Sequence, residues 1–241
     1  MSAGGGLRPQ VPRLVTPSVR SQSAAAKPTD TAAIQAVLST PRANTYISAA
    51  GGDTAQAMAL YGWNARIAAA LMLPSHFAEI STRNAVDEAI TAVYGPKWPW
   101  NQTFQQSLPS PKGHIYNPQR DLIQTRSREQ TTGKVVAELK LSFWQAMFTA
   151  RHDERIWHHQ ILSLFPNTAG KTAKELRKQV RDDLEVIRKL RNRIAHHEPI
   201  FARDLSDDLA RMLDLVELRS TATAQWVRQM EEASTILTQR P

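Results

Sequence analysis

The chain contains no cysteine and no hydrophobic run long enough to cross a membrane. Without cysteine, its 241 residues can form neither disulfides nor thiolate zinc sites. The longest apolar stretch, around residues 67–73, is far shorter than the ~20 residues that a membrane-spanning helix requires. These absences exclude a disulfide scaffold and predict a cytoplasmic protein without a membrane partner.

Acidic residues are scarce relative to basic ones. Thirty Lys and Arg stand against 22 Asp and Glu, which gives a formal net charge of +8. Such a balance favours a polyanionic partner, nucleic acid above all. Part of the excess lies in residues 171–203, which contain ten basic and five acidic side chains.

The first 28 residues contain no acidic side chain at all. They are rich in Gly, Ser, Ala, Pro and Arg, and they lack the apolar centre of a secretory signal. This composition cannot form a core, so residues 1–28 are predicted to be a disordered basic tail. An Arg-rich, acid-poor segment is also typical of a mitochondrial transit peptide. As a basic tail it would add weak contacts to phosphates.

Alternating strand patterns are missing from residue 29 onward, where helical periodicity dominates. Residues 29–239 are therefore predicted to form one all-α domain. Pro74 is expected to kink or break a long helix, and residues 96–117, rich in proline, are expected to be irregular. Trp98 and Trp100 in that segment either anchor it to the bundle or stack on RNA bases. The expected helices span residues 31–38, 41–50, 54–73, 77–93, 118–130, 134–148, 153–165, 172–197, 204–219 and 221–238.

The most informative stretch is residues 190–200, LRNRIAHHEPI, at the end of a long amphipathic helix. At ~100° per residue, Asn192 and His196 share a face that points away from the apolar stripe of this helix. His196 should therefore meet solvent or a second subunit rather than the core. Arg191 lies at the edge of the stripe, and His197 lies nearer to it. The stripe consists of Val180, Leu184, Ile187, Leu190 and Ile194.

The spacing of Arg, four residues and His resembles the HEPN ribonuclease motif. With Asn192 after the Arg, and Glu-Pro-Ile-Phe after the second His, the segment resembles the bacterial Abi-like (abortive infection) protein family. Further landmarks of the resemblance are SxPR (39–42), ALYGWN (59–64), EISTRN (79–84), YGPKW (94–98), LSFWQAMF (141–148), Phe165-Pro166 and Trp226.

This resemblance implies a HEPN-like helical bundle with additional helices. It implies a metal-independent endoribonuclease of an abortive-infection or toxin–antitoxin defence system. Two motif helices would meet in a homodimer and share one site, and an antitoxin or a regulatory RNA is a possible partner.

The residue types suit this chemistry. RNA cleavage without a metal needs a base for the 2′-hydroxyl, an acid for the leaving 5′-oxygen and a cation for the phosphate. Histidine and arginine serve these roles, so no metal or cofactor is expected. The predicted catalytic residues are Arg191, Asn192 and His196, and the accessory candidates are His197, Arg193, Glu79, Arg83 and Asn84.

Other interpretations stay open. The spacing is loose, and a second case, Arg151 to His158, is interpreted as structural. Glu79 and Arg83, four residues apart, form either a simple ion pair or a group that orients the motif. The basic helix could also serve a non-catalytic RNA-binding protein, or a helical regulator that binds a protein partner.

Overall fold

Helices make up the architecture of residues 30–241, the part of the chain that the computed structural model describes. No strand occurs among these residues, so the predicted all-α class is confirmed. The predicted tail at residues 1–28 lies outside the described residues. In chain order the elements are α1 (Thr31–Leu38), α2 (Thr40–Ala49), α3 (Thr54–Tyr94), η1 (Trp98–Trp100), α4 (Gln102–Ser107), α5 (Pro118–Arg126), α6 (Thr132–Glu138), α7 (Leu141–Met147), η2 (Ala150–His152), η3 (Asp153–Trp157), α8 (His158–Leu164), α9 (Ala173–Ala195), α10 (Leu205–Arg219), α11 (Thr221–Met230) and α12 (Ala233–Leu237).

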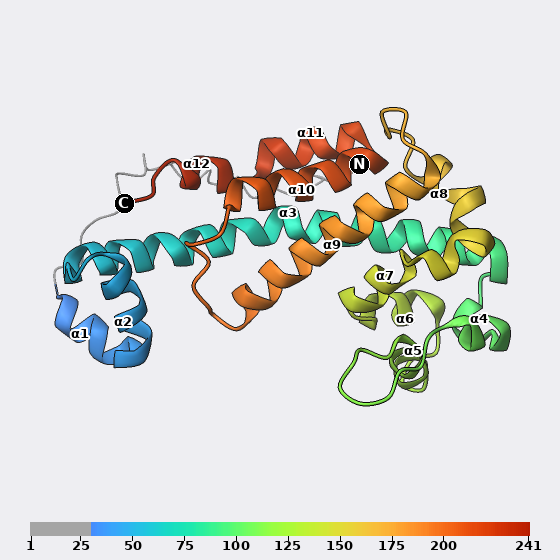
Figure 1. Cartoon of the computed structure of the whole chain (residues 1–241), viewed down its shortest axis with the longest axis horizontal. Coiled ribbons are helices and arrows are strands. Elements are labelled where there is room, and N and C mark those ends of the chain that lie inside the picture. Colours follow the sequence, from blue (N-terminus) through green and yellow to red (C-terminus); the bar gives the residue numbers. More distant parts are fainter. Residues whose placement is uncertain (1–29) are drawn as a thin grey trace, which may run out of the picture.

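Helix α3 forms the axis of the molecule. It runs along most of its length, with α1 and α2 at one end and α4–α7 toward the other (Figure 1). Helices α10–α12 lie along one side of α3, and α9 crosses it (Figure 1). The end of α9 is thereby brought to the same end of the molecule as α2.

The expected interruption at Pro74 is wrong, because α3 continues through it as a single helix of 41 residues. Proline lacks the N–H that would bond one turn back. Here the loss is offset by burial: Pro74 belongs to the buried face of α3, and Leu71 and Ala78 on the neighbouring turns are fully buried. Packing along both halves of the helix therefore outweighs the local preference to break.

Three further boundaries differ from expectation. Helix α4 lies inside residues 96–117, which were expected to be irregular, and Asn101 caps it by accepting a hydrogen bond from Phe104 N. The expected helix 134–148 is two helices, since Leu139 is extended between α6 and α7 while its side chain stays buried. The expected helix 221–238 is likewise two, α11 and α12, separated at residues 231–232.

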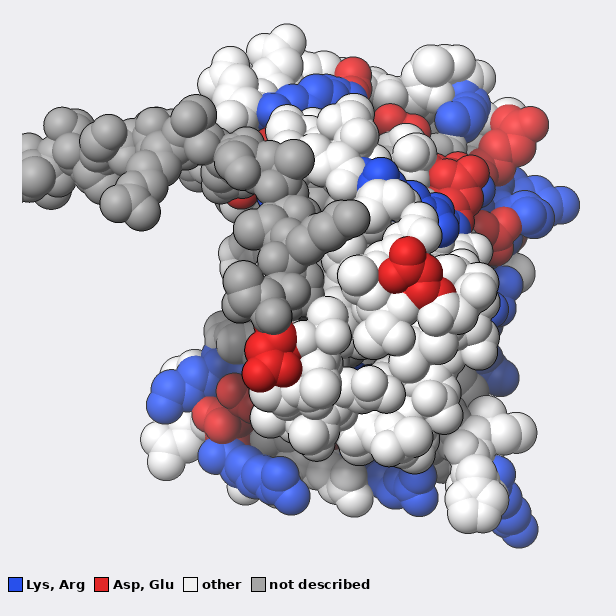
Figure 2. Space-filling view, turned by 90° about the vertical axis from the view of Figure 1, so that its left-hand side faces the viewer, with Lys and Arg blue, Asp and Glu red and all other residues white. Residues whose placement is uncertain are grey.

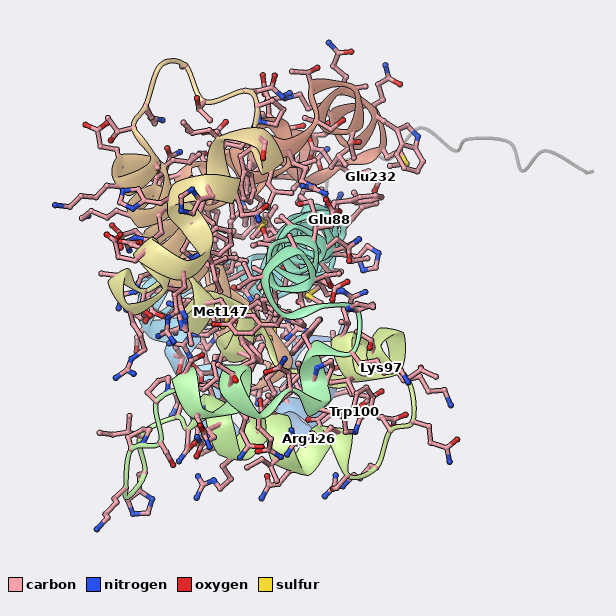
Figure 3. The ribbon with its side chains drawn as sticks, turned by 90° about the vertical axis from the view of Figure 1, so that its right-hand side faces the viewer. Glu88, Lys97, Trp100, Arg126, Met147 and Glu232 are labelled. Atoms are coloured by element: carbon pink, nitrogen blue, oxygen red, sulfur yellow. The ribbon has the colours of Figure 1, made fainter. Side chains whose placement is uncertain are left out.

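Trp98 anchors the segment after α3 rather than serving as a stacking platform. Its ring is fully buried, and its Nε1 donates a 2.7 Å hydrogen bond to Oδ1 of Asp87. Trp100 is 37% exposed and lies close to Arg126 at this end of the molecule (Figure 3), where Arg126 donates to the carbonyl of Pro99. The anchoring interpretation is confirmed for Trp98.

Helix α9 begins at a capping box. Thr172 accepts a hydrogen bond from Glu175 N, while the Glu175 side chain accepts one from Thr172 N. The predicted apolar stripe packs into the core, with Ile194 partly buried at its end. None of the helices in residues 30–241 combines the length and the apolar character of a membrane span.

Candidate functional site at the end of helix α9

Helix α9 ends in a tight turn that presents two histidines. His196 caps the helix, and His197 adopts a left-handed conformation with φ of +55°. His197 N donates to the carbonyl of Ile194 (3.0 Å), and Glu198 N donates to that of Arg193 (2.8 Å). This is the Schellman pattern of helix ends, in which glycine usually occupies the left-handed position. Histidine at that position carries a conformational cost of ~1 kcal/mol or more.

Arg193 holds the turn from within α9. Its Nη2 and Nε donate hydrogen bonds of 2.7 and 3.2 Å to the carbonyl oxygen of Pro199. Its Nε also lies 3.6 Å from a carboxylate oxygen of Glu198. Nε and Nη2 of the guanidinium thus hold the turn, and the predicted accessory role of Arg193 stays a prediction.

Two side chains from other helices fix the same turn. Arg42 of α2 donates a 2.6 Å hydrogen bond from Nη1 to the carbonyl of His197. Asn64 of α3 accepts through Oδ1 from Ile200 N at 2.8 Å and from Phe201 N at 3.1 Å. Because α2, α3 and α9 all hold it, the turn is a rigid feature rather than a free loop.

The predicted polar face of α9 is open. Asn192, His196 and His197 are exposed, and their side chains make no hydrogen bond or ion pair with residues 30–241. The prediction that His196 lies outside the core is confirmed. The prediction that the helix includes His197 is wrong, because α9 ends at Ala195 and His197 belongs to the turn that follows.

Arg191 turns toward α3 instead of toward His196. Its Nε lies 3.3 Å from Oε2 of Glu79, and the two side chains are 41% and 17% exposed. Glu79 therefore contacts the motif helix, as the orienting interpretation predicted, but through Arg191 and not through Asn192 or His196. No ion pair joins Glu79 to Arg83 among the described residues.

Arg83 and Asn84 stand apart from the motif. Asn84 is exposed, and neither side chain makes a hydrogen bond or ion pair to a residue of the motif. Nε of Arg83 is buried and has no partner within residues 30–241. Of the predicted accessory residues on α3, only Glu79 is brought to the motif.

Two grooves flank the turn and share His197 and Glu198. One, of about 350 Å³, lies between the turn and the start of α2. The other, of about 270 Å³, lies between the turn and α3. The first is lined by Ser39, Pro41, Arg42, Thr45, His196, His197, Glu198 and Pro199.

Sequence reasoning missed Arg42 and Asn64 as residues of the site. Both lie in segments that it had singled out, SxPR at 39–42 and ALYGWN at 59–64, but only as landmarks. Their contacts with the turn span 155 and 136 residues of sequence. Helical periodicity is a local signal, so it could not connect them with residues 197–201.

The second Arg–His pair is structural. Arg151 Nη1 donates to the carbonyl of Ser107 at 3.4 Å, and His158 Nδ1 lies 3.3 Å from Glu154. His152 is 1% exposed, and burial lowers its pKa to about 4, with the nearby charges of Arg155 and Arg151 adding to the effect. Among residues 30–241, no group of side chains is arranged to hold a metal ion.

Comparison with known proteins found no matching family model, no matching curated protein and no matching solved structure.

Proposed function

We propose that the chain is a metal-independent endoribonuclease whose catalytic residues are Arg191, Asn192 and His196, acting in an abortive-infection or toxin–antitoxin defence system. One observation carries the proposal. His196, exposed and without a side-chain partner, lies on a turn that Arg42, Arg193 and Asn64 hold in place. A histidine held at the surface, beside a groove that Arg42 also lines, supports a role in proton transfer on a bound polyanion.

The reaction would use the substrate's own 2′-hydroxyl. One imidazole accepts its proton while the 2′-oxygen attacks the phosphorus, and a second acid gives a proton to the leaving 5′-oxygen. The bond from phosphorus to the 5′-oxygen breaks, leaving a 2′,3′-cyclic phosphate. Arg191 would stabilise the charge on the phosphoryl oxygens. Its Nε is paired with Glu79, but the Arg191 side chain is 41% exposed, so the rest of the guanidinium is accessible to a phosphate. DNA lacks the nucleophile.

A homodimer of HEPN-like type would supply both proton-transfer groups. One chain offers a single His196, and two copies related by a two-fold axis provide two. The exposed Asn192–His196 face of α9 is free to take part in such a contact.

A second candidate is a non-catalytic RNA-binding protein. The ion pair of Arg191 with Glu79 favours it, because a phosphate contact by Arg191 competes with a carboxylate already in place. In that case Asn192 and His196 would be contacts rather than catalysts, and an antitoxin or regulatory RNA would be the ligand.

Cleavage of labelled RNA by the purified full-length chain in EDTA tests the proposal. Products ending in 2′,3′-cyclic phosphate are expected, together with loss of cleavage but retention of RNA binding in His196→Ala. A requirement for magnesium, or cleavage of DNA, would refute the mechanism. RNA binding without cleavage by the wild-type chain would favour the second candidate.

Mixing subunits tests the shared site. With subunit exchange allowed, an excess of His196→Ala chains should lower the activity per wild-type chain as mixed dimers form. Undiminished activity, or a monomer that cleaves RNA, would contradict the composite site.

A further inference from the structure

The groove between the turn and α3 is not used by the proposed chemistry. Its floor consists of small side chains of α3, which leave room beside the helix. The aromatic rings of Tyr46 and Tyr61 lie at one side, 4.8 Å apart in an edge-to-face arrangement. The groove is lined by Tyr46, Tyr61, Asn64, Ala65, Ala68, Ala69, Ile194, His197 and Glu198.

Two largely buried side chains of this groove each present a polar group that has no partner within residues 30–241. Asn64 is 7% exposed, and its orientation is fixed because Oδ1 accepts from the backbone N–H groups of Ile200 and Phe201. Its Nδ2 therefore carries two donors, and it makes no hydrogen bond within residues 30–241. Tyr46 is 2% exposed, and its hydroxyl likewise has no partner there. Neither atom is among the fully enclosed polar atoms without a partner, so both donors are open to the groove, where a ligand that carries acceptors can replace water.

We propose that this groove binds a keto nucleobase, guanine or uracil, of the RNA strand that enters the site; the inference rests on the proposed function. A keto base presents a carbonyl acceptor next to a ring N–H donor. The carbonyl would accept from Asn64 Nδ2 and the Tyr46 hydroxyl, and the ring N–H would donate to the carboxylate of Glu198, which is 49% exposed at the rim. Adenine and cytosine present an amino donor where the carbonyl would lie, so they leave these donors unpaired.

The rest of the groove suits the flat face of a base. Tyr61 is partly exposed, and with the ring of His197 it offers surfaces for stacking. His197 and Glu198 also line the groove that contains His196, so a base here and a phosphate there can belong to neighbouring positions of one strand. Uncharged side chains occupy much of this end of the molecule, and Lys and Arg lie around its edge with Asp and Glu among them (Figure 2). The basic side chains can meet the flanking phosphates.

Binding to the full-length His196→Ala protein tests the inference without requiring cleavage. The probes are hexauridylate and hexacytidylate, which have the same charge and differ in the edge that the groove would read. Hexauridylate should bind about tenfold more tightly or better. Equal affinity for the two, or no binding of either, would overturn the inference.

Variants of Asn64 and Tyr46 test whether these two side chains cause the preference for hexauridylate over hexacytidylate. Asn64→Asp, made in the His196→Ala protein, keeps the oxygen that the backbone uses and replaces the donor with an acceptor, so the preference should shift toward hexacytidylate. Tyr46→Phe keeps the ring and should reduce discrimination severalfold. Asn44→Asp, on the exposed side of α2, adds the same charge outside the groove and should keep the preference. Discrimination that survives both groove variants would overturn the inference.

The outcomes separate this inference from the proposed function. Base discrimination that depends on Asn64, in a chain whose wild-type form never cuts RNA, would leave the groove assignment standing and remove the nuclease. Cleavage by the wild-type chain with no base preference would do the reverse.

Discussion

Two segments of this chain combine arginine with histidine, and they differ in what their side chains touch. Around residues 191–197, the histidines are exposed and unpaired while arginines and an asparagine hold the backbone beneath them. Around residues 151–158, His152 is buried, and Arg151 and His158 are occupied by a carbonyl and a carboxylate. Both histidines of the first segment are therefore exposed without a hydrogen-bonding partner, whereas His158 of the second segment is exposed but paired with Glu154.

The two segments also differ in backbone conformation. Residues 153–157 form a π-helix that continues directly into α8, so the second segment stays within helical packing. The first segment leaves its helix through a left-handed residue and is held by two other helices. A spacing motif is therefore informative only together with the burial and the partners of its members.

The largest effect is expected for His196→Ala. Loss of a proton-transfer group costs about 10²–10⁴-fold in rate, and the exposed side chain makes no hydrogen bond or ion pair within residues 30–241. Single-turnover RNA cleavage and circular dichroism measure the two effects. His158→Ala in the other segment is the matched control and should keep wild-type activity. His197→Ala should lose less than His196→Ala; the reverse order would move the catalytic role by one residue.

Arg191→Lys should have the next largest effect, a loss of about 10²-fold in the cleavage rate. Lysine keeps the charge but not the planar pair of donors that grips a phosphate. Cleavage rates at saturating RNA measure the loss, and Arg151→Lys is the control in the structural segment. Full activity in Arg191→Lys would mean that positive charge alone is sufficient.

Much of the fold could be predicted from helical periodicity. The expected helix starts at residues 31, 54 and 172 lie within one residue of the starts of α1, α3 and α9, and the predicted stripe of α9 is its buried face. Pro74 was misjudged because its burial between packed turns is a tertiary effect. The extended residue between α6 and α7 was missed for the same reason, since Leu139 leaves the helix to reach the core.

The site was predictable only in part. Helical phase correctly placed His196 outside the core, because orientation on a helix is a local property. In the sequence, Arg193 and Arg191 were equally good candidates for a phosphate contact. In the structure Arg193 binds the carbonyl of Pro199, and this contact depends on the path of the backbone after the end of α9, which periodicity does not predict. Arg42 and Asn64 required the three-dimensional approach of α2 and α3 to the turn.

The buried His152 should make stability depend on pH. Its folded pKa of about 4 lies below the ordinary 6.5, so the unfolded chain takes up a proton first as the pH falls. Its contribution to stability is present above pH 6.5 and is lost on acidification, by about 2 kcal/mol at pH 5. Urea unfolding at pH 7.5 and pH 5 measures the loss. His152→Leu cannot titrate and should remove this part of the pH dependence; an unchanged difference between the two pH values would contradict the assignment.

The smallest effect is expected for His197→Gly, and it tests whether strain at the turn is kept for function. His197 has a φ of +55°, where a side chain costs ~1–2 kcal/mol and glycine costs nothing. Glycine also gains freedom in the unfolded chain, worth ~0.5–1 kcal/mol, so the net stabilisation should be ~0–1.5 kcal/mol. Ala169, with a φ of +49° before α9, is the matched position, and Ala169→Gly should stabilise by a similar amount in urea unfolding. RNA affinity should fall only in His197→Gly, because that variant alone removes a ring from the grooves beside His196. Unchanged RNA affinity in His197→Gly would mean that the strained histidine serves neither groove.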